Sequence, residues 1–301
     1  MTIGNKMAKS IIIGMGIGQL YKTVLENLGH DIVTVDTDPS KGAKYNSIDG
    51  AILLEGPFDT AHICTPNFTH FDIATKIAPH AKIVFIEKPG VVNSSTWTQL
   101  IETFNQTRFM MVKNNMWRSN INELQYIASL ASKVNFNWIN EDRVPNPGTW
   151  FTTKDLAFGG VSRDLMPHLL SLFIACNPDW KSFKIGSTIE RVKKWDLESL
   201  TRTDYGTVKE DGIYDVDDFC RLTYGKKWRL TADWKSLITD RRNIEFTMKK
   251  DNSTIVFQLG LCPEDAYQTM IKDAFENVDN DTYWEIQNEQ DIWIHQQIEN
   301  I

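Results

Sequence analysis

The chain has few cysteines, and their spacing fits neither a disulfide framework nor a zinc site. Its four cysteines, Cys64, Cys176, Cys220 and Cys262, lie far apart in 301 residues and form no CxxC pair. Such spacing predicts free thiols in a reducing compartment, so we expect a cytoplasmic location. No spacing of histidine, cysteine and carboxylate residues matches a metal site, and we therefore expect no metal.

Long apolar runs and a surplus of positive charge are also lacking. The longest apolar runs are short, such as 11–13 and 83–86, whereas a membrane span requires about 20 apolar residues. The N-terminal MTIGNKMAKS is polar and has no apolar signal-peptide core. A net charge of -7 repels the phosphate backbone of nucleic acids. These absences predict that neither a membrane nor a nucleic acid is a partner.

The composition that remains is that of a folded, globular protein. Hydrophobic residues make up 42% and charged residues 24%, which excludes a disordered chain, a collagen and a coiled coil. A chain of this length forms one large or two medium domains. At this size about 75% of the unfolded surface is buried, so the core needs no disulfide or metal to stabilise it.

The first third of the chain alternates short β-branched runs with helical patterns. Strand-like runs cover 10–13, 31–35, 60–64, 82–86 and 109–112, and we count the last three as the fourth, fifth and sixth strands. Between the first two runs, Leu20, Val24, Leu25 and Leu28 recur at helical spacing. This alternation predicts an α/β domain over residues 1–118, with a doubly wound parallel sheet.

The pattern changes near residue 120. Helices are predicted near 120–132, 165–175, 264–275 and 283–299, and strands over 134–139, 183–193, 216–224, 227–234, 242–249 and 253–259. Residues 119–301 are therefore predicted to form an α+β domain with an open, mainly antiparallel sheet. The two sheet segments 227–234 and 242–249 include Trp228, Leu230, Trp234, Ile244, Phe246 and Met248. We expect these apolar residues to form an exposed face that binds another subunit.

A glycine-rich loop joins the first strand to the first helix. Gly14-Met15-Gly16-Ile17-Gly18 opens the helix, and Asp36 follows 22 residues after Gly14, at the end of the second strand. In dinucleotide sites such glycines approach the pyrophosphate, and such a carboxylate accepts the ribose hydroxyl. The third glycine of the usual spacing would fall on Gln19. Either the loop is one residue shorter, or Gln19 replaces the glycine that packs closely. A plain glycine-rich turn is the alternative.

Three polar segments follow predicted strands or open a helix. They are Thr65-Pro66-Asn67-Phe68-Thr69-His70, Glu87-Lys88-Pro89 and the run from Gly159 to His168. The first two end parallel strands, at the edge where such sheets bind ligands. In the third, Asp164 and His168 are four residues apart and are predicted to share one helix face. Because Pro167 fits only the first turn, that helix is predicted to start near Asp164.

Taken together, these segments resemble the glucose–fructose oxidoreductase / inositol dehydrogenase family (Gfo/Idh/MocA) over essentially the whole chain. The resemblance implies an NAD(P)-binding Rossmann domain at 1–118 and a substrate-binding and oligomerisation domain at 119–301. It implies reversible oxidation of a secondary alcohol on a sugar, cyclitol or sugar nucleotide. It also implies a cis bond between Lys88 and Pro89, and a homodimer or homotetramer in which the open sheet face contacts another subunit.

The candidate site residues fall into three groups. Those expected to bind the cofactor are Gly14, Met15, Gly16, Ile17, Gly18, Asp36, Thr65, Pro66, Asn67, His70, Glu87 and Lys88. Those expected to be catalytic are Lys88, Asp164 and His168, and these three, with Asn115, are expected to bind the substrate. Further candidate substrate contacts are Lys113, Asn114, Trp117, Arg118, Arg143 and Trp150.

The chemistry leaves the identity of the base open. Removing hydride from an alcohol carbon requires a base for the hydroxyl proton. Histidine titrates near pH 6.5 and suits this role, which makes His168 a candidate. Lys88 is the rival base, because a positive nicotinamide would favour its neutral form. Alternatively, Asp164 and His168 are a helix-terminal acid and a packed histidine, Lys88 is a surface lysine, and His70 lies on a helix face.

Cofactor choice and function have alternatives as well. Asp36 is followed by Thr37 and Asp38, with no arginine to receive a 2'-phosphate, so NAD is expected rather than NADP. The main hypothesis is a dehydrogenase with a small polyol or sugar-type substrate. The alternatives are a reductase of another small carbonyl or imine substrate, and a non-catalytic regulatory protein that binds a dinucleotide.

Overall fold

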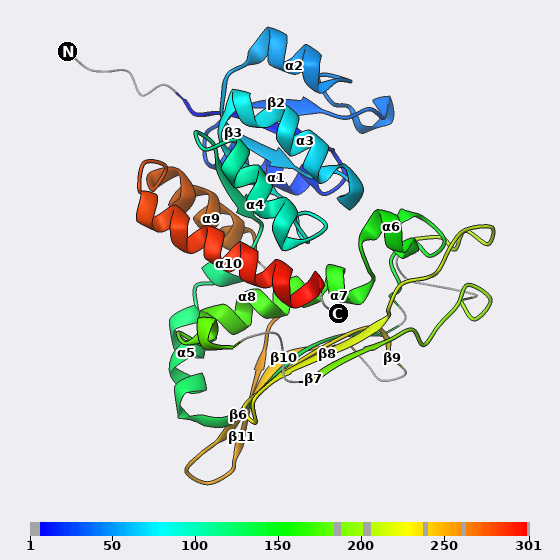
Figure 1. Ribbon diagram of the computed structural model, residues 1–301, viewed down its shortest axis with the longest axis vertical. Coiled ribbons are helices and arrows are strands. Elements are labelled where there is room, and N and C mark those ends of the chain that lie inside the picture. Colours follow the sequence, from blue (N-terminus) through cyan, green and yellow to red (C-terminus); the bar gives the residue numbers. More distant parts are fainter. Residues whose placement is uncertain are drawn as a thin grey trace. The chain divides into compact units, whose positions relative to one another are not determined.

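A computed structural model describes residues 7–141, 143–183, 188–200, 206–236, 240–260 and 263–299. The chain divides into two compact units, whose elements are labelled in Figure 1. Unit 1 comprises Met1–Val112 with Tyr267–Ile292, and unit 2 comprises Lys113–Ala266 with Trp293–Ile301. Cys64, Cys176 and Cys220 are buried free thiols, whereas Cys262 lies outside the described residues.

Unit 1 contains a five-stranded parallel sheet in the order β2-β1-β3-β4-β5. Its strands are β1 Lys9–Ile13, β2 Asp31–Val35, β3 Phe58–Ile63, β4 Ala81–Ile86 and β5 Arg108–Met111. The helices along this part are α1 Gly18–Asn27, α2 Ile48–Glu55, α3 His70–Ile77 and α4 Ser94–Thr103. Short 3-10 turns lie at η1 Pro39–Lys41, η2 Asn67–Thr69 and η3 Ala78–His80. The predicted doubly wound α/β fold is confirmed.

The strand count differs from the prediction. The runs at 60–64, 82–86 and 109–112 were counted as fourth to sixth, but they form the third, fourth and fifth strands of this sheet. The segment between β2 and β3 is helical, because Ser47 caps α2 by accepting a hydrogen bond from the Gly50 amide at 3.2 Å. The strands therefore follow one another in β-α-β units without an extra strand.

Two C-terminal helices, α9 Glu264–Glu276 and α10 Asp281–Glu299, were predicted to belong wholly to the second domain. The structure instead groups Tyr267–Ile292 with unit 1. Arg108 Nε donates to the Val278 carbonyl at 3.2 Å, and the Met111 amide donates to Asp291 at 3.0 Å. These bonds tie the helical segment to β5, a long-range pairing that helical periodicity does not reveal. The boundary near the middle of the chain lies after Val112 rather than after residue 118.

Unit 2 contains a six-stranded sheet in the order β11-β10-β6-β9-β8-β7. Its strands are β6 Ala131–Glu141, β7 Thr188–Val192, β8 Phe219–Tyr224, β9 Trp228–Ser236, β10 Arg241–Met248 and β11 Thr254–Gln258. The β6–β9 pair is parallel and the others are antiparallel, so the mainly antiparallel sheet is confirmed. The other elements are α5 Ile121–Leu130, α6 Lys154–Ala157, α7 Val161–Asp164, α8 Met166–Cys176, η4 Asn114–Trp117, η5 Trp150–Thr152 and η6 Trp180–Ser182. Part of the predicted strand at 183–193 lies outside the described residues.

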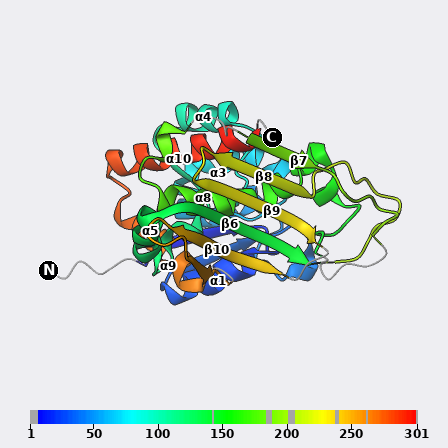
Figure 2. The same ribbon diagram turned by 90° about the horizontal axis from the view of Figure 1, so that it is seen from below.

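One face of this sheet packs on α8, and Figure 2 views the sheet from the opposite face. A row of paired residues, Ile244, Phe136 and Leu230, crosses β10, β6 and β9, and all three are fully buried. Two residues along, on the same face, the row of Phe246, Val134 and Trp228 is also apolar, whereas the row on the other side pairs Trp138 and Ala232 with Arg242. The helix-facing side of the sheet is therefore the core of unit 2.

The apolar surface predicted for subunit binding is part of this core. Trp228, Leu230, Trp234, Ile244 and Phe246 are buried within the unit, and Met248 is half-buried. The open face instead carries polar pairs: Asn137 donates to Asn243 at 2.9 Å, and Arg221 pairs with Glu190 at 3.0 Å. The prediction of an exposed apolar face from these residues is wrong, since their strand parity directs them toward the helix. In the described part of the chain, each helix is too short or too polar to cross a membrane.

Candidate active site

The glycine loop leaves room where a dinucleotide would need it. Gly14 has a φ of 92°, and a Cβ there would lie 2.7 Å from the Cys64 carbonyl oxygen. A Cβ at Gly16 would meet nothing within 4 Å, so the loop is open at its second glycine. A Cβ at Gly18 would lie 2.9 Å from the Ile12 side chain in β1. The three glycines thus serve the turn, the open approach and the close packing of α1 on the sheet.

This arrangement decides between the two alternatives for the loop. Gly18, not Gln19, is the residue that packs closely on the sheet, and α1 begins at Gly18. Gln19 is exposed. The loop is therefore one residue shorter than the usual spacing.

Asp36 reaches back to the glycine loop from the end of β2. One carboxylate oxygen accepts the Met15 amide at 2.6 Å, and the other accepts the Asp38 amide at 2.8 Å. These bonds fix the carboxylate beside the loop, where a ribose hydroxyl of a bound dinucleotide would donate to it. The residues at the loop and at Asp36 therefore fit the adenosine half of such a cofactor.

His70 connects the loops that follow β3 and β4. Its ring is buried, with Nδ1 at 2.6 Å from the Gly90 carbonyl oxygen and Nε2 at 2.8 Å from that of Thr65. Burial lowers the pKa of His70, although hydrogen bonding to the two carbonyls opposes this effect. Because both ring nitrogens face backbone oxygens, the ring braces two loops and offers neither nitrogen to a cofactor. The structural alternative for His70 is favoured.

Lys88 lies on a loop that is held on both sides. The Lys88–Pro89 bond is cis, as predicted. Glu87 accepts the Tyr21 hydroxyl at 2.6 Å through one oxygen and the Lys88 amide at 3.1 Å through the other. Burial, together with the Glu87 charge, raises the pKa of Tyr21 well above its usual value. Tyr21 was not predicted as a site residue, because its helical spacing indicated only core packing.

In unit 2, Asp217 holds the turn that precedes Asp164. Its carboxylate accepts the amides of Gly160 and Ser162, each at 2.9 Å, and the Ser162 hydroxyl at 2.9 Å. Arg191 pairs with the same carboxylate at 2.9 Å. A Cβ at residue 160 would lie 1.8 Å from the Asp217 carbonyl oxygen, so only glycine fits there. Sequence reasoning missed Asp217, although an Asp-Asp pair opening an apolar strand was a visible signal.

The helix carrying His168 starts later than predicted. α7 ends at Asp164 and α8 begins at Met166, so Asp164 and His168 lie on two helices joined at Leu165. Pro167 occupies the first turn of α8, as predicted. Asp164 accepts the Trp234 indole N–H at 2.8 Å, and the His168 ring stacks on Trp138 with centroids 5.1 Å apart. Both side chains are half-buried, and each has a partner on the sheet.

Two further predicted residues lie beside His168. Asn115 Nδ2 is 3.3 Å from His168 Nδ1, and Asn115 Oδ1 accepts Arg118 Nε at 2.8 Å. Arg118 also donates through Nη1 to the Leu259 carbonyl at 2.7 Å. The structure thus brings Asn115, Arg118 and His168 together within unit 2.

Other predicted substrate contacts have different surroundings. Lys113 and Asn114 are buried. Arg143 pairs with Asp240 at 3.2 Å, and Trp150 stacks on Phe151 with centroids 4.1 Å apart. Trp117 ends η4 and is half-buried. Among the described residues, no group of three histidine, cysteine or carboxylate side chains is placed to hold a metal.

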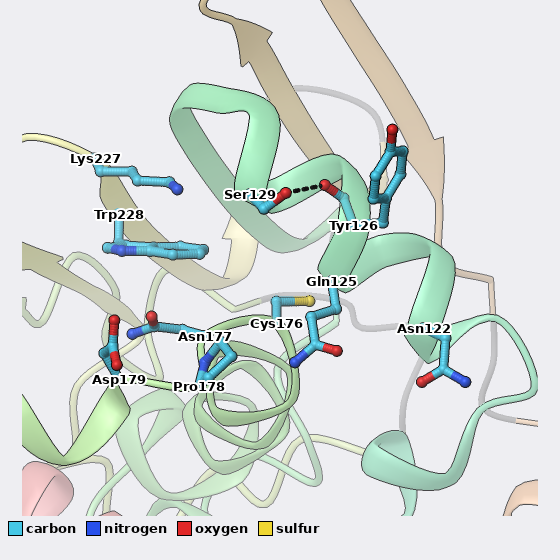
Figure 3. A pocket seen from close by; sticks show the side chains of 10 residues that line it. All are labelled: Asn122, Gln125, Tyr126, Ser129, Cys176, Asn177, Pro178, Asp179, Lys227 and Trp228. Atoms are coloured by element: carbon cyan, nitrogen blue, oxygen red, sulfur yellow. Dashed lines mark hydrogen bonds between the residues drawn. The ribbon is translucent and has the colours of Figure 1, made fainter.

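A pocket of about 510 Å³ lies elsewhere in unit 2, between α5, the end of α8 and the start of β9 (Figure 3). Its lining residues are Asn122, Gln125, Tyr126, Ser129, Cys176, Asn177, Pro178, Asp179, Lys227 and Trp228. Lys227 donates to the Ala128 carbonyl at 2.8 Å, and burial lowers its pKa. None of the predicted site residues lines this pocket, so it is separate from the candidate chemistry.

Comparison with known proteins agrees with this geometry. Residues 12–114 match the family described as "Oxidoreductase family, NAD-binding Rossmann fold", GFO_IDH_MocA. This segment belongs to the Gfo/Idh/MocA family. The predicted family is thus confirmed over the NAD-binding part of the chain, where the glycine loop, Asp36 and Lys88 lie.

The whole chain shares its fold with solved structures of low sequence identity. An inositol dehydrogenase homolog complexed with NAD+ from Azotobacter vinelandii has a TM-score of 0.72 at 14% identity, covering 98% of this chain and 95% of that one. The WlbA dehydrogenase from Bordetella pertussis, in complex with NADH and UDP-GlcNAcA, has a TM-score of 0.69 at 13% identity, covering 96% and 93%. At these identities the likeness shows the fold.

One curated relative is more similar in sequence. A putative UDP-kanosamine synthase oxidoreductase subunit from Amycolatopsis mediterranei (strain S699) is 25% identical over 178 residues. The match covers 54% of this chain and 49% of the relative. The chain thus spans about half the length of that protein.

Gly16 and Gly18 predict different outcomes on substitution. Gly16→Val places a side chain in open space, so the thermal midpoint should stay within a few degrees of the wild type. The same side chain blocks approach of the pyrophosphate, and NADH affinity should fall at least about tenfold. Gly18→Ala forces Ile12 to move and should cost about 1–3 kcal/mol of stability. Calorimetric unfolding and NADH fluorescence titration measure both effects; equal destabilisation by the two variants would contradict this assignment.

Proposed function

We propose that the chain is an NAD-dependent oxidoreductase that transfers hydride between a secondary alcohol and the nicotinamide. The observation that carries this proposal is the open glycine loop beside a carboxylate, with Asp36 2.6 Å from the Met15 amide. Membership of residues 12–114 in an NAD-binding oxidoreductase family supports it. The bound dinucleotide would supply the hydride acceptor. The buried free thiols of Cys64, Cys176 and Cys220 support a cytoplasmic location, which cell fractionation tests.

The residues of this chain would supply proton transfer and orientation. Either Lys88 or His168 accepts the hydroxyl proton, and the other donates a hydrogen bond to the same oxygen. Asp164 helps to orient the substrate, with one of its oxygens already held by the Trp234 indole. Lys88 belongs to unit 1, whereas His168 and Asp164 belong to unit 2. Asn115 and the polar groups near it would contact the remainder of the substrate.

A sugar, cyclitol or sugar nucleotide is the proposed substrate class. Similar structures include an inositol dehydrogenase homolog and a dehydrogenase solved with UDP-GlcNAcA, and the curated relative is named for UDP-kanosamine synthesis. A reductase of another small carbonyl or imine, or a non-catalytic dinucleotide-binding regulator, is the alternative. The presence of Lys88, Asp164 and His168 together favours catalysis, since a regulator needs none of them. A screen of polyols, sugars and nucleotide sugars for nicotinamide reduction separates these functions.

The carboxylate at the end of β2 predicts cofactor preference. A 2'-phosphate would face Asp36, with Asp38 two residues on, and neither arginine nor lysine stands at 37 to pair with it. NAD should bind at least about tenfold more tightly than NADP, and Asp36→Ala should narrow the difference. Asp72→Ala, at an exposed position in α3, is the matched control and should leave the preference unchanged. Calorimetric titration with both cofactors measures this; tighter binding of NADP by the wild type would reject it.

Substitution of the proposed catalytic residues should separate turnover from cofactor binding. Lys88→Met and His168→Ala should each lower kcat by on the order of 100-fold, the usual effect of losing a positioned proton-transfer group. Asp36→Ala should weaken cofactor binding while kcat at saturating cofactor changes little. Steady-state kinetics and cofactor titration on folded variants measure the contrast. Retention of normal turnover by both Lys88→Met and His168→Ala would reject the proton-transfer roles proposed for these two residues.

We also propose that the chain forms a homodimer or homotetramer through the open face of the unit 2 sheet. This proposal rests on the family resemblance, since the apolar residues first expected there lie in the core. Asn137 and Asn243 are buried on this face, and the exposed Arg221–Glu190 pair would contribute polar contacts to the interface. Light scattering at micromolar concentration should give at least twice the 34.6 kDa chain mass. A mass equal to one chain would reject the proposal.

A further inference from the structure

We infer that Arg118 and Asn115 hold His168 as the neutral tautomer protonated at Nε2. His168 then donates a hydrogen bond to the substrate oxygen and does not accept its proton, and Lys88 is the base. This inference rests on the proposed function and assigns roles that the function alone leaves open. It makes Asn115 and Arg118 positioning residues that act through His168.

Arg118 fixes the orientation of the Asn115 amide. The oxygen and nitrogen of an amide look alike in electron density, but a guanidinium carries only donors. The Asn115 atom that lies 2.8 Å from Arg118 Nε must therefore be the oxygen. Arg118 is itself fixed by its bond to the Leu259 carbonyl and is only 8% exposed. The amide nitrogen of Asn115 consequently faces His168.

The orientation of the amide decides where the proton of His168 resides. Asn115 Nδ2 has only hydrogens to offer, so His168 Nδ1, 3.3 Å away, acts as the acceptor. A neutral imidazole carries one N–H, and with Nδ1 accepting, that hydrogen is on Nε2. In a doubly protonated ring, Nδ1–H would point at the amide hydrogens of Asn115. The neutral Nε2–H form is therefore the one that this contact stabilises.

The ring of His168 has an aromatic partner and charged residues around it. Trp138 stacks on the imidazole at an interplanar angle of 19°, and the Arg242 guanidinium lies over Trp138, 5.3 Å from the ring centroid. The elements packed against α8 carry charged residues of both signs, which are Glu123 on α5, Arg163 and Asp164 on α7, Lys133 and Glu141 on β6, and Arg229, Asp233 and Lys235 on β9, while Lys113 and Arg118 flank η4. Because both signs are present, the Asn115 contact rather than the surrounding charge decides the form of the ring. Asp164, four residues before His168, uses one oxygen for the Trp234 indole.

The step balances with these roles. In the oxidation direction the O–H bond of the substrate breaks and its proton passes to the neutral amine of Lys88, forming an ammonium. The C–H electron pair leaves as hydride, with the oxidised dinucleotide as acceptor, and a C=O bond forms. His168 keeps its proton throughout and stabilises the charge that develops on oxygen through its Nε2–H. Asn115 and Arg118 ensure that a hydrogen, not a lone pair, faces that oxygen.

Nitrogen NMR of the full-length protein tests the tautomer without any substrate. With ¹⁵N-labelled histidine, the His168 signals are those lost in His168→Gln, and the wild type should show Nδ1 unprotonated and Nε2 protonated. In Asn115→Asp the carboxylate still accepts from Arg118 but now also accepts from Nδ1–H, so the pattern should reverse. Asn122→Asp adds the same charge at an exposed position in α5 and should leave the wild-type pattern. Protonated Nδ1 in the wild type, or an unchanged pattern in Asn115→Asp, would overturn the inference.

The kinetic test measures how the ratio of Asn115→Asp kcat to wild-type kcat changes with pH. The direction of this change differs between His168 as a hydrogen-bond donor and His168 as a base. In Asn115→Asp the neutral ring presents a lone pair at Nε2, so kcat should fall about 100-fold at alkaline pH, the usual loss for one such donor. As the pH falls, the imidazolium regains Nε2–H, and the ratio of variant to wild-type kcat should rise. If His168 were the base, the added carboxylate would assist it, and the ratio would be one or more and rise with pH.

The NMR test and the kinetic test distinguish failure of the inference from failure of the proposed function. If no alcohol is oxidised by the wild type, the proposed function is wrong, while the NMR pattern still decides the tautomer. If alcohols are oxidised but the kcat ratio rises with pH, the oxidoreductase proposal remains and the donor role of His168 is rejected.

Discussion

The geometry of unit 2 around Asp164 depends on one buried carboxylate. Asp217 is 3% exposed, and a buried charge is tolerated only when its oxygens are bonded. It gains that bonding from the Gly160 and Ser162 amides and from Arg191. The same bonds force the chain into a turn so tight that Gly160 admits no side chain. The position from which α7 and α8 start is thus set by the need to satisfy a charge.

The same constraint operates in unit 1 on the loop bearing Lys88. Glu87 is 9% exposed, and its two oxygens take the Tyr21 hydroxyl and the Lys88 amide. His70 is buried and has a carbonyl oxygen against each ring nitrogen. The two bonds of Glu87 and the place of the His70 ring between two carbonyl oxygens both require the present shapes of the loops after β3 and β4. Residues near the predicted catalytic groups therefore act mainly by fixing backbone, which is why His70 braces loops rather than facing a cofactor.

Signals from residues close in sequence predicted much of this structure, whereas contacts between residues distant in sequence were not predicted. The glycine loop and Asp36 followed from residues close in sequence, and the cis bond before Pro89 followed from the family resemblance. Strand parity in unit 2 did not, because alternation shows that two faces differ without showing which one a helix covers. The Gly160–Asp217 bond joins residues 57 apart, and the C-terminal helices join β5 across a longer separation still. Such pairings carry no periodic signature. The sequence therefore did not predict the hydrogen bonds of Asp217 or the grouping of the C-terminal helices with unit 1.

Hydrogen-bond direction carries information beyond the positions of the residues. Arg118, Asn115 and His168 are joined by two contacts in series. Of the three side chains, only the guanidinium of Arg118 is restricted to donating, since the amide and the imidazole can each donate or accept. Because Arg118 can only donate, it orients the Asn115 amide, and the amide in turn determines which nitrogen of the imidazole is protonated. A lysine at 118 would offer one flexible ammonium in place of the planar guanidinium, and it would not fix the Asn115 amide in the same way. An aspartate at 115 would reverse the last bond while keeping the first. The location of the proton on His168 therefore depends on Asn115 and Arg118, which explains why a Lys-Asp-His motif alone does not identify the base.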